Sequence, residues 1–323
     1  MSVTQVAPPV QQTHAKYERL IARAQQVDPV TTIVVHPCDE SSLRGAVEAA
    51  QDGIIVPILV GPAAKIKAVA QANNFDISRF ELVDAGESEA SAAAKGVELI
   101  HQAKGEVLMK GSLHTDELMR AVASSKGGLR TERRISHVFV MDVPTYTETL
   151  FITDAAINIF PDLDAKRDIV QNAIDLWTQT IQTTPRVAIL SAVETVTSKI
   201  PSTIEAAALC KMADRGQITG GILDGPLAFD NAIDPEAARI KRINSEVAGR
   251  AQILVVPDLE AGNMLAKNLS FLAQADAAGI VLGARVPVVL TSRADSVRTR
   301  LASCAVAVLM ADARRRSAAV PAA

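Results

Sequence analysis

The chain has 323 residues, a length that favours two domains over one compact core. Its net charge of −3 argues against a broad surface for nucleic acid or for an anionic membrane. Hydrophobic residues make up 48% of the chain but aromatic residues only 3%, so the core must consist of small aliphatic side chains, which suit helices packed on a parallel sheet.

The first residues of the chain and its cysteines exclude further classes of protein. Residues 1–16 are predicted to be a disordered tail, and they lack the apolar segment of a secretory signal. No apolar run reaches the roughly 18 residues that a membrane helix needs. Cys38, Cys210 and Cys304 lie far apart and form no CxxC pair, which argues against a zinc cluster or a disulfide framework. We therefore expect a cytoplasmic protein without a bound metal.

From residue 17 onward, predicted strands and helices alternate. The predicted helices span 17–26, 41–53, 63–74, 88–104, 115–125, 164–183, 204–215, 261–274 and 296–311. The predicted strands span 31–37, 54–61, 81–86, 106–112, 135–144, 149–155 and 186–192, followed by the stretches ITGGILDGPL, QILVVPDL and GIVLGARVPVVLTS.

This alternation predicts an α/β fold with mainly parallel sheet. The strands at 135–144 and 149–155 have no helix-length segment between them, so we expect them to be antiparallel neighbours. That pair is a natural crossing between two domains, and the chain is expected to recross near residue 290. The predicted domains are 17–150 with 291–323, and 151–290.

Polar clusters follow four of the predicted strands, in FITDAAIN, ILDGPLAFD, VVPDLEAGN and VLTSRADS. Ligands of parallel sheets bind outside the carboxyl ends of the strands, where helix N-termini favour anions. The four clusters are therefore expected to border one cleft. The alternative is that Asp154, Asp224 and Asp258 merely cap helices or turns.

Two motifs carry groups suited to an anionic substrate. In KGSLHTDELMR, a strand end runs into a helix, and Lys110, Ser112, His114 and Thr115 are placed to reach a bound anion. Arg120 follows in the same helix and offers a two-pronged hydrogen bond to phosphate, unless it is only a surface charge.

In SRADS, Ser292 and Arg293 are suited to stabilise a charged oxygen, and Asp295 to accept a proton. The alternative for Asp295 is a capping role at the last helix. The sequence contains no P-loop motif, no GxGxxG after the first strand, no GxSxG and no HExxH, which argues against the enzyme classes that depend on them.

Several stretches, among them KGSLHTDELMRAV, FITDAAIN, LDGPLAFDNAI, PDLEAGNMLAKNL and VVLTSRADS, occur in the order of one family. From about residue 17 to 311 the chain resembles the phosphate acetyl/butyryltransferase family. The resemblance implies two α/β/α domains facing a cleft, in an isocitrate/isopropylmalate dehydrogenase-like architecture. It also implies a homodimer that moves an acetyl or short acyl group between coenzyme A (CoA) and inorganic phosphate, giving acyl phosphate, with no permanently bound cofactor.

The resemblance also assigns residues. It places the phosphate-side residues on Thr115 and Arg120, and a Ser-Arg pair that holds developing charge on Ser292 and Arg293. A carboxylate deprotonates the CoA thiol, and the thiolate attacks the acyl carbonyl. We expect Asp154, Asp258, Asn263 and Lys267 on the CoA side of the cleft.

One position departs from the family pattern. Acetyl-specific members carry an acidic residue where this chain has Thr299, which leaves Asp295 as the nearest candidate base. Three alternatives to acetyl transfer therefore remain open: butyryl specificity, a non-catalytic sensor of acyl-CoA or acyl phosphate, and an NAD- and metal-dependent decarboxylating dehydrogenase. The last needs an aspartate cluster and a tyrosine–lysine pair, and the chain has only two tyrosines.

Overall fold

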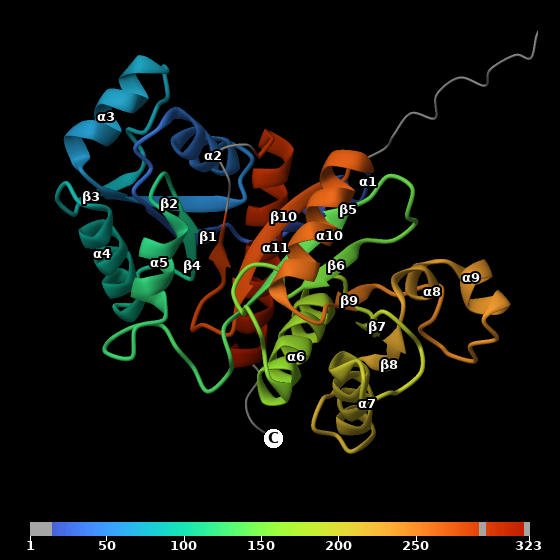
Figure 1. Ribbon diagram of the computed structural model, residues 1–323. Helices are drawn as coiled ribbons and strands as arrows, with labels where there is room; N and C mark the ends of the chain where they lie inside the picture. Colours follow the sequence, from blue (N-terminus) through green and yellow to red (C-terminus); the bar gives the residue numbers. More distant parts are fainter. Residues whose placement is uncertain (1–14, 291–294, 320–323) are drawn as a thin grey trace, which may run out of the picture.

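A computed structural model describes residues 15–290 and 295–319. Eleven strands in this part of the chain form a single sheet (Figure 1). In order across the sheet, the strands are β3 (Glu81–Asp84), β2 (Ile55–Gly61), β1 (Val30–Val35), β4 (Val107–Lys110), β11 (Val288–Val289), β10 (Asp276–Leu282), β5 (Ser136–Asp142), β6 (Leu150–Thr153), β9 (Ile253–Val255), β7 (Arg186–Leu190) and β8 (Ile222–Leu227).

The two halves of this sheet run in opposite directions. Strands β3, β2, β1, β4 and β11 are parallel to one another, and so are β6, β9, β7 and β8. The reversal occurs at three antiparallel contacts in the middle, between β11 and β10, β10 and β5, and β5 and β6. The C-terminal ends of β1 and β4 therefore open at one edge of the sheet, and those of β6 and β9 at the opposite edge.

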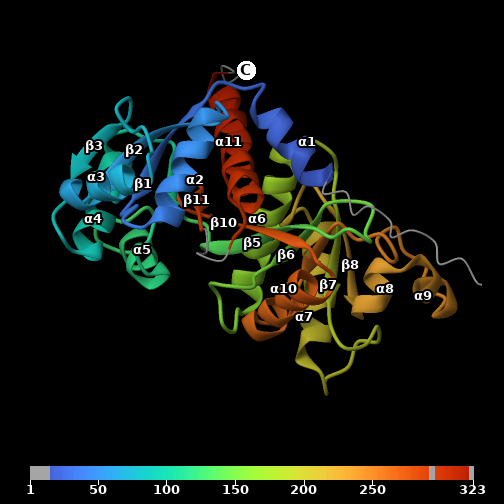
Figure 2. The same ribbon diagram turned by 90° about the horizontal axis from the view of Figure 1, so that it is seen from above.

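Helices cover both faces of the sheet (Figure 2). They are α1 (Ala15–Ala24), α2 (Glu40–Gln51), α3 (Ala63–Ala72), α4 (Glu89–His101), α5 (Thr115–Val122), α6 (Leu163–Thr180), α7 (Pro201–Asp214), α8 (Phe229–Ile233), α9 (Pro235–Ile240), α10 (Leu259–Leu272) and α11 (Val297–Ala319). Helices α1, α2, α6 and α11 share one core, to which β1 contributes Val34. Helices α4 and α5 pack on the other face, where Ile33 and Val35 point, because side chains alternate along a strand.

Small residues and polar caps explain how the helices form and pack. The side chains of Asp39, Ser88 and Asp162 accept hydrogen bonds from backbone N–H groups in the first turns of α2, α4 and α6. Gly96 lets α4 approach β1 closely, since a Cβ there would lie 2.7 Å from Cγ2 of Val35. The low aromatic content thus corresponds to close packing of helices on the sheet.

Most predicted elements are confirmed, including the antiparallel pair β5 and β6. The short helices α8 and α9 were not predicted, because five or six residues carry little periodic signal. Helix α1 begins at Ala15, so residues 15 and 16, which were predicted to belong to a disordered tail, are helical. Asp224 lies within β8 and not after it.

The return of the chain near residue 290 is also visible. Helix α11 packs against α1 and α2, as expected for a final helix on the first half, but it contacts α6 as well. Because one continuous sheet carries both halves, the division into residues 17–150 with 291–323, and 151–290, stays a prediction. In the described part of the chain, no helix is both long and apolar enough to cross a membrane.

Candidate active site

The C-terminal ends of β1 and β4 form a topological switch point. These two strands are parallel neighbours. Helix α2, which follows β1, packs in the core that contains α11, whereas α5, which follows β4, packs with α4 on the opposite face. In open α/β sheets, ligands usually bind beside such a divergence.

Backbone contacts hold the two strand ends close together. The N–H of Gly111 donates to the carbonyl of Val35 at 2.8 Å, and that of Ser112 to the carbonyl of His36 at 2.8 Å. A Cβ on Gly111 would lie 2.3 Å from the Val35 carbonyl oxygen. Glycine is therefore required where β4 leaves the sheet.

Ser112 and His36 form a polar group at this switch point. Oγ of Ser112 lies 3.0 Å from Nδ1 of His36 and accepts the N–H of Cys38 at 3.2 Å. Burial lowers the pKa of His36, which favours a neutral imidazole at pH 7. Burial also raises the pKa of the Cys38 thiol to about 11, so this thiol stays protonated and is a poor nucleophile.

The predicted phosphate-binding residues are only partly brought together. The side chain of Lys110 is buried, and its Nζ lies 3.3 Å from the carbonyl of Gly111. His114 precedes α5, and its N–H donates to the carboxylate of Glu89 at 2.9 Å. Thr115 is exposed at the first position of α5 and lines a pocket.

Arg120 lies apart from this pocket. Its side chain is 69% exposed, and Nη1 lies 2.6 Å from a carboxylate oxygen of Glu117 on the same helix. The described geometry thus matches the alternative of a surface charge.

The predicted catalytic segment is described only from Asp295 onward. Ser292 and Arg293 lie outside the described residues. The carbonyl of Asp295 accepts a hydrogen bond from Nη2 of Arg300 at 2.5 Å. Ser296 directly precedes α11, and its Oγ accepts the N–H of Thr299 at 3.1 Å, as a capping side chain does. The two roles predicted for Asp295 both stay predictions. Oγ1 of Thr299 lies 3.4 Å from Oδ1 of Asp276.

The acidic residues of the second half hold backbone in place. Asp154 is 3% exposed, and its carboxylate accepts the N–H groups of residues 156, 157 and 158. Asp258 caps α10 by accepting the N–H of Ala261 at 2.9 Å. Within β8, Asp224 accepts the N–H of Gly225 at 2.8 Å. Asp154 and Asp258 thus make the turn-forming and capping contacts of the alternative, whereas Asp224 bonds the next residue of its own strand.

That all four polar clusters border one cleft stays a prediction. Strands β6 and β9 end at the edge opposite to β4 and β11, because the sheet reverses direction at its centre. On α10, Nδ2 of Asn263 donates to the carbonyl of Ala155 at 3.3 Å, and Lys267 is exposed. The side chain of Asn263 thus lies beside the loop that follows β6.

One pocket nevertheless joins the two halves. It has a volume of about 390 Å3 and lies between α5 and the loop that follows β6. Its lining consists of Thr115, Asp116, Met119, Ala123, Arg130, Arg133, Arg134, Ile135, Ala156, Ile157 and Asn158. The three arginines were not predicted as site residues, although GLRTERRIS between two predicted elements offered a signal for them.

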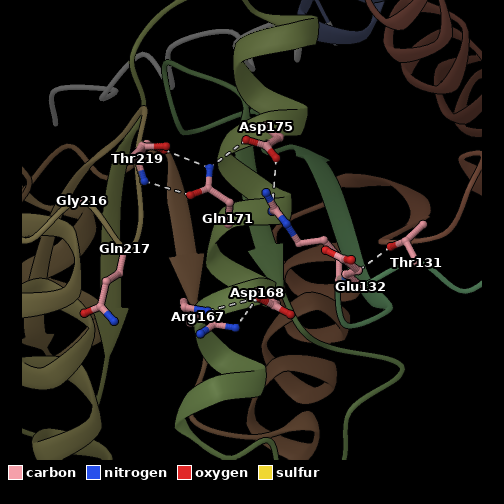
Figure 3. Close-up of a pocket in the computed structure, with 10 residues that line it drawn as sticks. Thr131, Glu132, Arg167, Asp168, Gln171, Asp175, Gly216, Gln217 and Thr219 are labelled. Atoms are coloured by element: carbon pink, nitrogen blue, oxygen red, sulfur yellow. Dashed lines mark hydrogen bonds and ion pairs between the residues drawn. The ribbon is translucent and has the colours of Figure 1, made fainter.

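A larger cavity of about 670 Å3 lies beside α6 and is less suited to a charged substrate (Figure 3). The side-chain amide of Gln171 exchanges hydrogen bonds with the backbone of Thr219 and donates to Asp175 at 2.8 Å. Arg167 contacts its neighbour Asp168. The charged and amide groups drawn in this cavity are thus largely paired with one another. Within the described residues, no group of three potential metal ligands occurs.

Comparisons with known proteins identify the family. A family model described as phosphate acetyl/butaryl transferase matches residues 87–308. A phosphate acetyltransferase of Rhizobium meliloti is 75% identical over 308 residues, which cover 95% of this chain and 97% of that protein. A phosphate butyryltransferase of Clostridium acetobutylicum is 39% identical, covering 91% of this chain and 98% of the relative.

Solved structures agree with the fold. A branched-chain phosphotransacylase of Enterococcus faecalis V583 is 28% identical, with a TM-score of 0.76, covering 87% of this chain and 99% of that chain. A 4-hydroxythreonine-4-phosphate dehydrogenase of Burkholderia phymatum, 14% identical, reaches a TM-score of 0.52 over 88% of this chain and 98% of its own, which supports the dehydrogenase-like architecture alone. Because the family model matches most of the chain and the two relatives are acyltransferases of this kind, the chain belongs to the phosphate acetyl/butyryl transferase family.

Proposed function

We propose that this chain transfers an acetyl group reversibly between coenzyme A and inorganic phosphate, giving acetyl phosphate. The observation that carries the proposal is the 75% identity to a phosphate acetyltransferase over 95% of the chain. The switch point between the ends of β1 and β4 supports it, because the predicted phosphate-side residues lie at and after the end of β4 and because β11, which precedes Ser292, is the parallel neighbour of β4.

In the proposed reaction, the CoA thiol loses its proton to a base, and the thiolate sulfur attacks the carbonyl carbon of acetyl phosphate. The tetrahedral oxyanion then collapses, the bond between carbon and the phosphate oxygen breaks, and phosphate leaves. Ser292 and Arg293 are proposed to stabilise the negative charge, and Asp295 to accept the proton. No cofactor remains bound between turnovers.

A direct transfer fits the chemistry of the cysteines. Burial raises the pKa of Cys38 to about 11, and those of Cys210 and Cys304 to about 12. Thiols with such pKa values carry almost no thiolate at neutral pH. The substrate thiol is therefore the proposed nucleophile, and a reducing cytoplasmic compartment is the proposed location, since all three cysteines are free.

On the phosphate side, the proposal assigns Lys110, His114 and Thr115 near the end of β4. Arg120 joins them only if it leaves Glu117, which costs little because the pair is exposed. On α10, Asn263 and Lys267 are proposed for the CoA side, with Asp154 and Asp258 fixing the adjoining backbone.

A thioester assay tests the function. Acetyl phosphate and CoA are mixed with the protein, and formation of acetyl-CoA is followed by thioester absorbance. Turnover with acetyl phosphate that exceeds turnover with butyryl phosphate supports the proposal. The reverse preference would make the chain a butyryltransferase, as the relative in Clostridium acetobutylicum is named.

Two further results would reject acyl transfer. CoA binding without turnover of acetyl, propionyl or butyryl phosphate would indicate a sensor. Reduction of NAD with a 2-hydroxy acid and Mg2+ would indicate a dehydrogenase.

We also propose a homodimer in which α10 takes part. Met264, Phe271 and Leu272 on this helix are 60%, 83% and 82% exposed, which is unusual for side chains of this size. Light scattering with size-exclusion chromatography should give twice the chain mass, and the double variant Phe271→Asp, Leu272→Asp should shift it to the monomer. A dimer that resists this change would exclude α10 from the interface.

A further inference from the structure

We propose that Arg134, oriented by Asn158 and assisted by Arg130, binds a phosphate group at the nucleotide end of coenzyme A. The inference rests on the proposed function and adds a recognition site to it. These three residues line the pocket between α5 and the loop after β6.

The backbone of Arg134 is fixed on α6. Its N–H donates to Oδ2 of Asp168 at 2.9 Å, and its carbonyl accepts from Nδ2 of Asn172 at 2.9 Å. Both partners belong to α6, a helix of 18 residues. The position of Arg134 is therefore set by a rigid element, although the residue lies in a connecting segment.

The side chain of Arg134 is oriented by a second set of contacts. Its Nε donates to Oδ1 of Asn158 at 2.8 Å. Asn158 is 4% exposed, and its Nδ2 donates to Oδ2 of Asp154 at 2.6 Å and to the carbonyl of Ile135 at 2.9 Å. Because every polar atom of this amide is engaged, it holds the guanidinium in one direction. The buried Asp154 therefore helps to orient Arg134 through Asn158, which its position after β6 alone did not indicate.

The ligand-binding atoms of the pair remain open. Within the described residues, the terminal nitrogens of Arg134 have no hydrogen-bond or ion-pair partner, and the same holds for the guanidinium of Arg130. Both side chains line the same pocket. An oriented guanidinium with free terminal nitrogens matches the oxygens of a phosphate group.

The rest of the pocket suits a nucleotide better than a small phosphate. Its volume of about 390 Å3 lies within the range of small-molecule sites. Beside the arginines it offers the apolar side chains of Met119 and Ile157, and Asp116 is its one carboxylate. Thr115, which is proposed for the substrate phosphate, stands at one side of this pocket, and the remaining space suits the flat base and the phosphate groups of CoA.

The test compares Arg134→Ala, Arg130→Ala and the wild type in the thioester assay, with CoA or 3′-dephospho-CoA as the thiol. We expect the KM for CoA to rise roughly tenfold or more in Arg134→Ala, as for a lost charge-assisted hydrogen bond. The KM for acetyl phosphate should stay within twofold. Arg130→Ala should show a smaller rise, and Arg79→Ala, an exposed arginine outside the pocket, should match the wild type.

The second thiol identifies the phosphate. If Arg134 binds the 3′-phosphate, dephospho-CoA is the poorer substrate of the wild type, and Arg134→Ala removes the difference. If it binds the diphosphate, both thiols weaken equally, and the proposal still stands. A rise in KM for acetyl phosphate alone, or no change in KM for any substrate, would overturn it.

Calorimetric titration of CoA into the same proteins separates this inference from the proposed function. Weaker CoA binding by Arg134→Ala supports the site even if the wild type transfers no acetyl group. Asn158→Ala should weaken CoA binding less than Arg134→Ala does, and Arg134→Lys should not restore it fully, because a lysine cannot reproduce the oriented fork. Equal binding by Arg134→Ala and the wild type would reject the site.

Discussion

The ends of β4 and β6 are both rich in polar residues, but they use them differently. After β6, the carboxylate of Asp154 accepts hydrogen bonds from the backbone of its own loop and from the side chain of Asn158. At the end of β4, the chain passes close to β1, and the side chains of Lys110, Ser112 and Thr115 follow one another at a switch point. Ser112 also holds backbone, since its Oγ accepts the N–H of Cys38, whereas Thr115 is exposed and lines a pocket. A polar cluster after a strand therefore indicates a ligand site through the groups that face a pocket.

The largest effect on activity is expected at the edge of the sheet where β4 and β11 end, because the proposed reaction takes place there. Arg293→Ala should lower turnover by at least about a hundredfold, because a donor to the transition-state charge is lost. Steady-state kinetics with acetyl phosphate and CoA measure this, and Asp295→Asn tests the proposed base separately. Near-normal rates in Arg293→Ala would mean that the chemistry lies elsewhere, and full activity in Asp295→Asn would remove Asp295 from the role of base.

Gly111→Ala should disturb the same edge structurally. The added Cβ would meet the backbone oxygens of Val35 and His36, which cannot move without breaking the contact between β1 and β4. We expect a loss of about 2.5 kcal/mol in the free energy of unfolding, measured by urea denaturation. Gly127→Ala is the control, since no atom lies within 4 Å of its Cβ and only the positive φ of 76° opposes the change. Equal losses in the two variants would contradict the close approach at Gly111.

His137 on β5, in the middle of the sheet, should make stability depend on pH. Burial lowers its pKa to about 4, against a small opposing effect of the Asp154 charge. The unfolded chain protonates this histidine near pH 6.5, so between about pH 6.5 and 4 the unfolded state binds more protons. The free energy of unfolding is therefore expected to fall as the pH falls through this range.

From these values, the contribution of His137 to the free energy of unfolding should decrease by about 2 kcal/mol between pH 7 and pH 5. His137→Gln should remove this part of the decrease, as measured by denaturation at both pH values. A variant that keeps the wild-type difference between pH 7 and pH 5 would show that another group is responsible.

The smallest effect is expected at the opposite edge of the sheet, where β6 and β9 end. Asp258→Ala removes the cap of α10 and should cost about 1 kcal/mol of stability. The value of kcat/KM for CoA should change less than twofold if the residue only caps the helix. A large rise in KM with unchanged stability would instead give the β9 strand end a direct part in binding CoA.

The sequence allowed the strands, most helices and the family resemblance to be predicted, because these depend on local patterns. It did not indicate that the sheet reverses direction at β10 and β5, since that depends on pairing between residues more than a hundred positions apart. Nor could spacing show that Asn158 orients Arg134, because Nε and Oδ1 meet only after β5, β6 and α6 have packed. Arg120 illustrates the reverse case, since its helix was predicted correctly while the described geometry pairs its side chain with Glu117.

The unbroken sheet bears on how the two halves can move. Three antiparallel strand pairs at the centre of the sheet join the two halves by hydrogen bonds, so within the described residues the halves are not connected by a linker alone. A substrate that draws α5 towards the loop after β6 must therefore change the twist of the central strands slightly. A hinge motion between the halves would instead break the hydrogen bonds of these three antiparallel contacts.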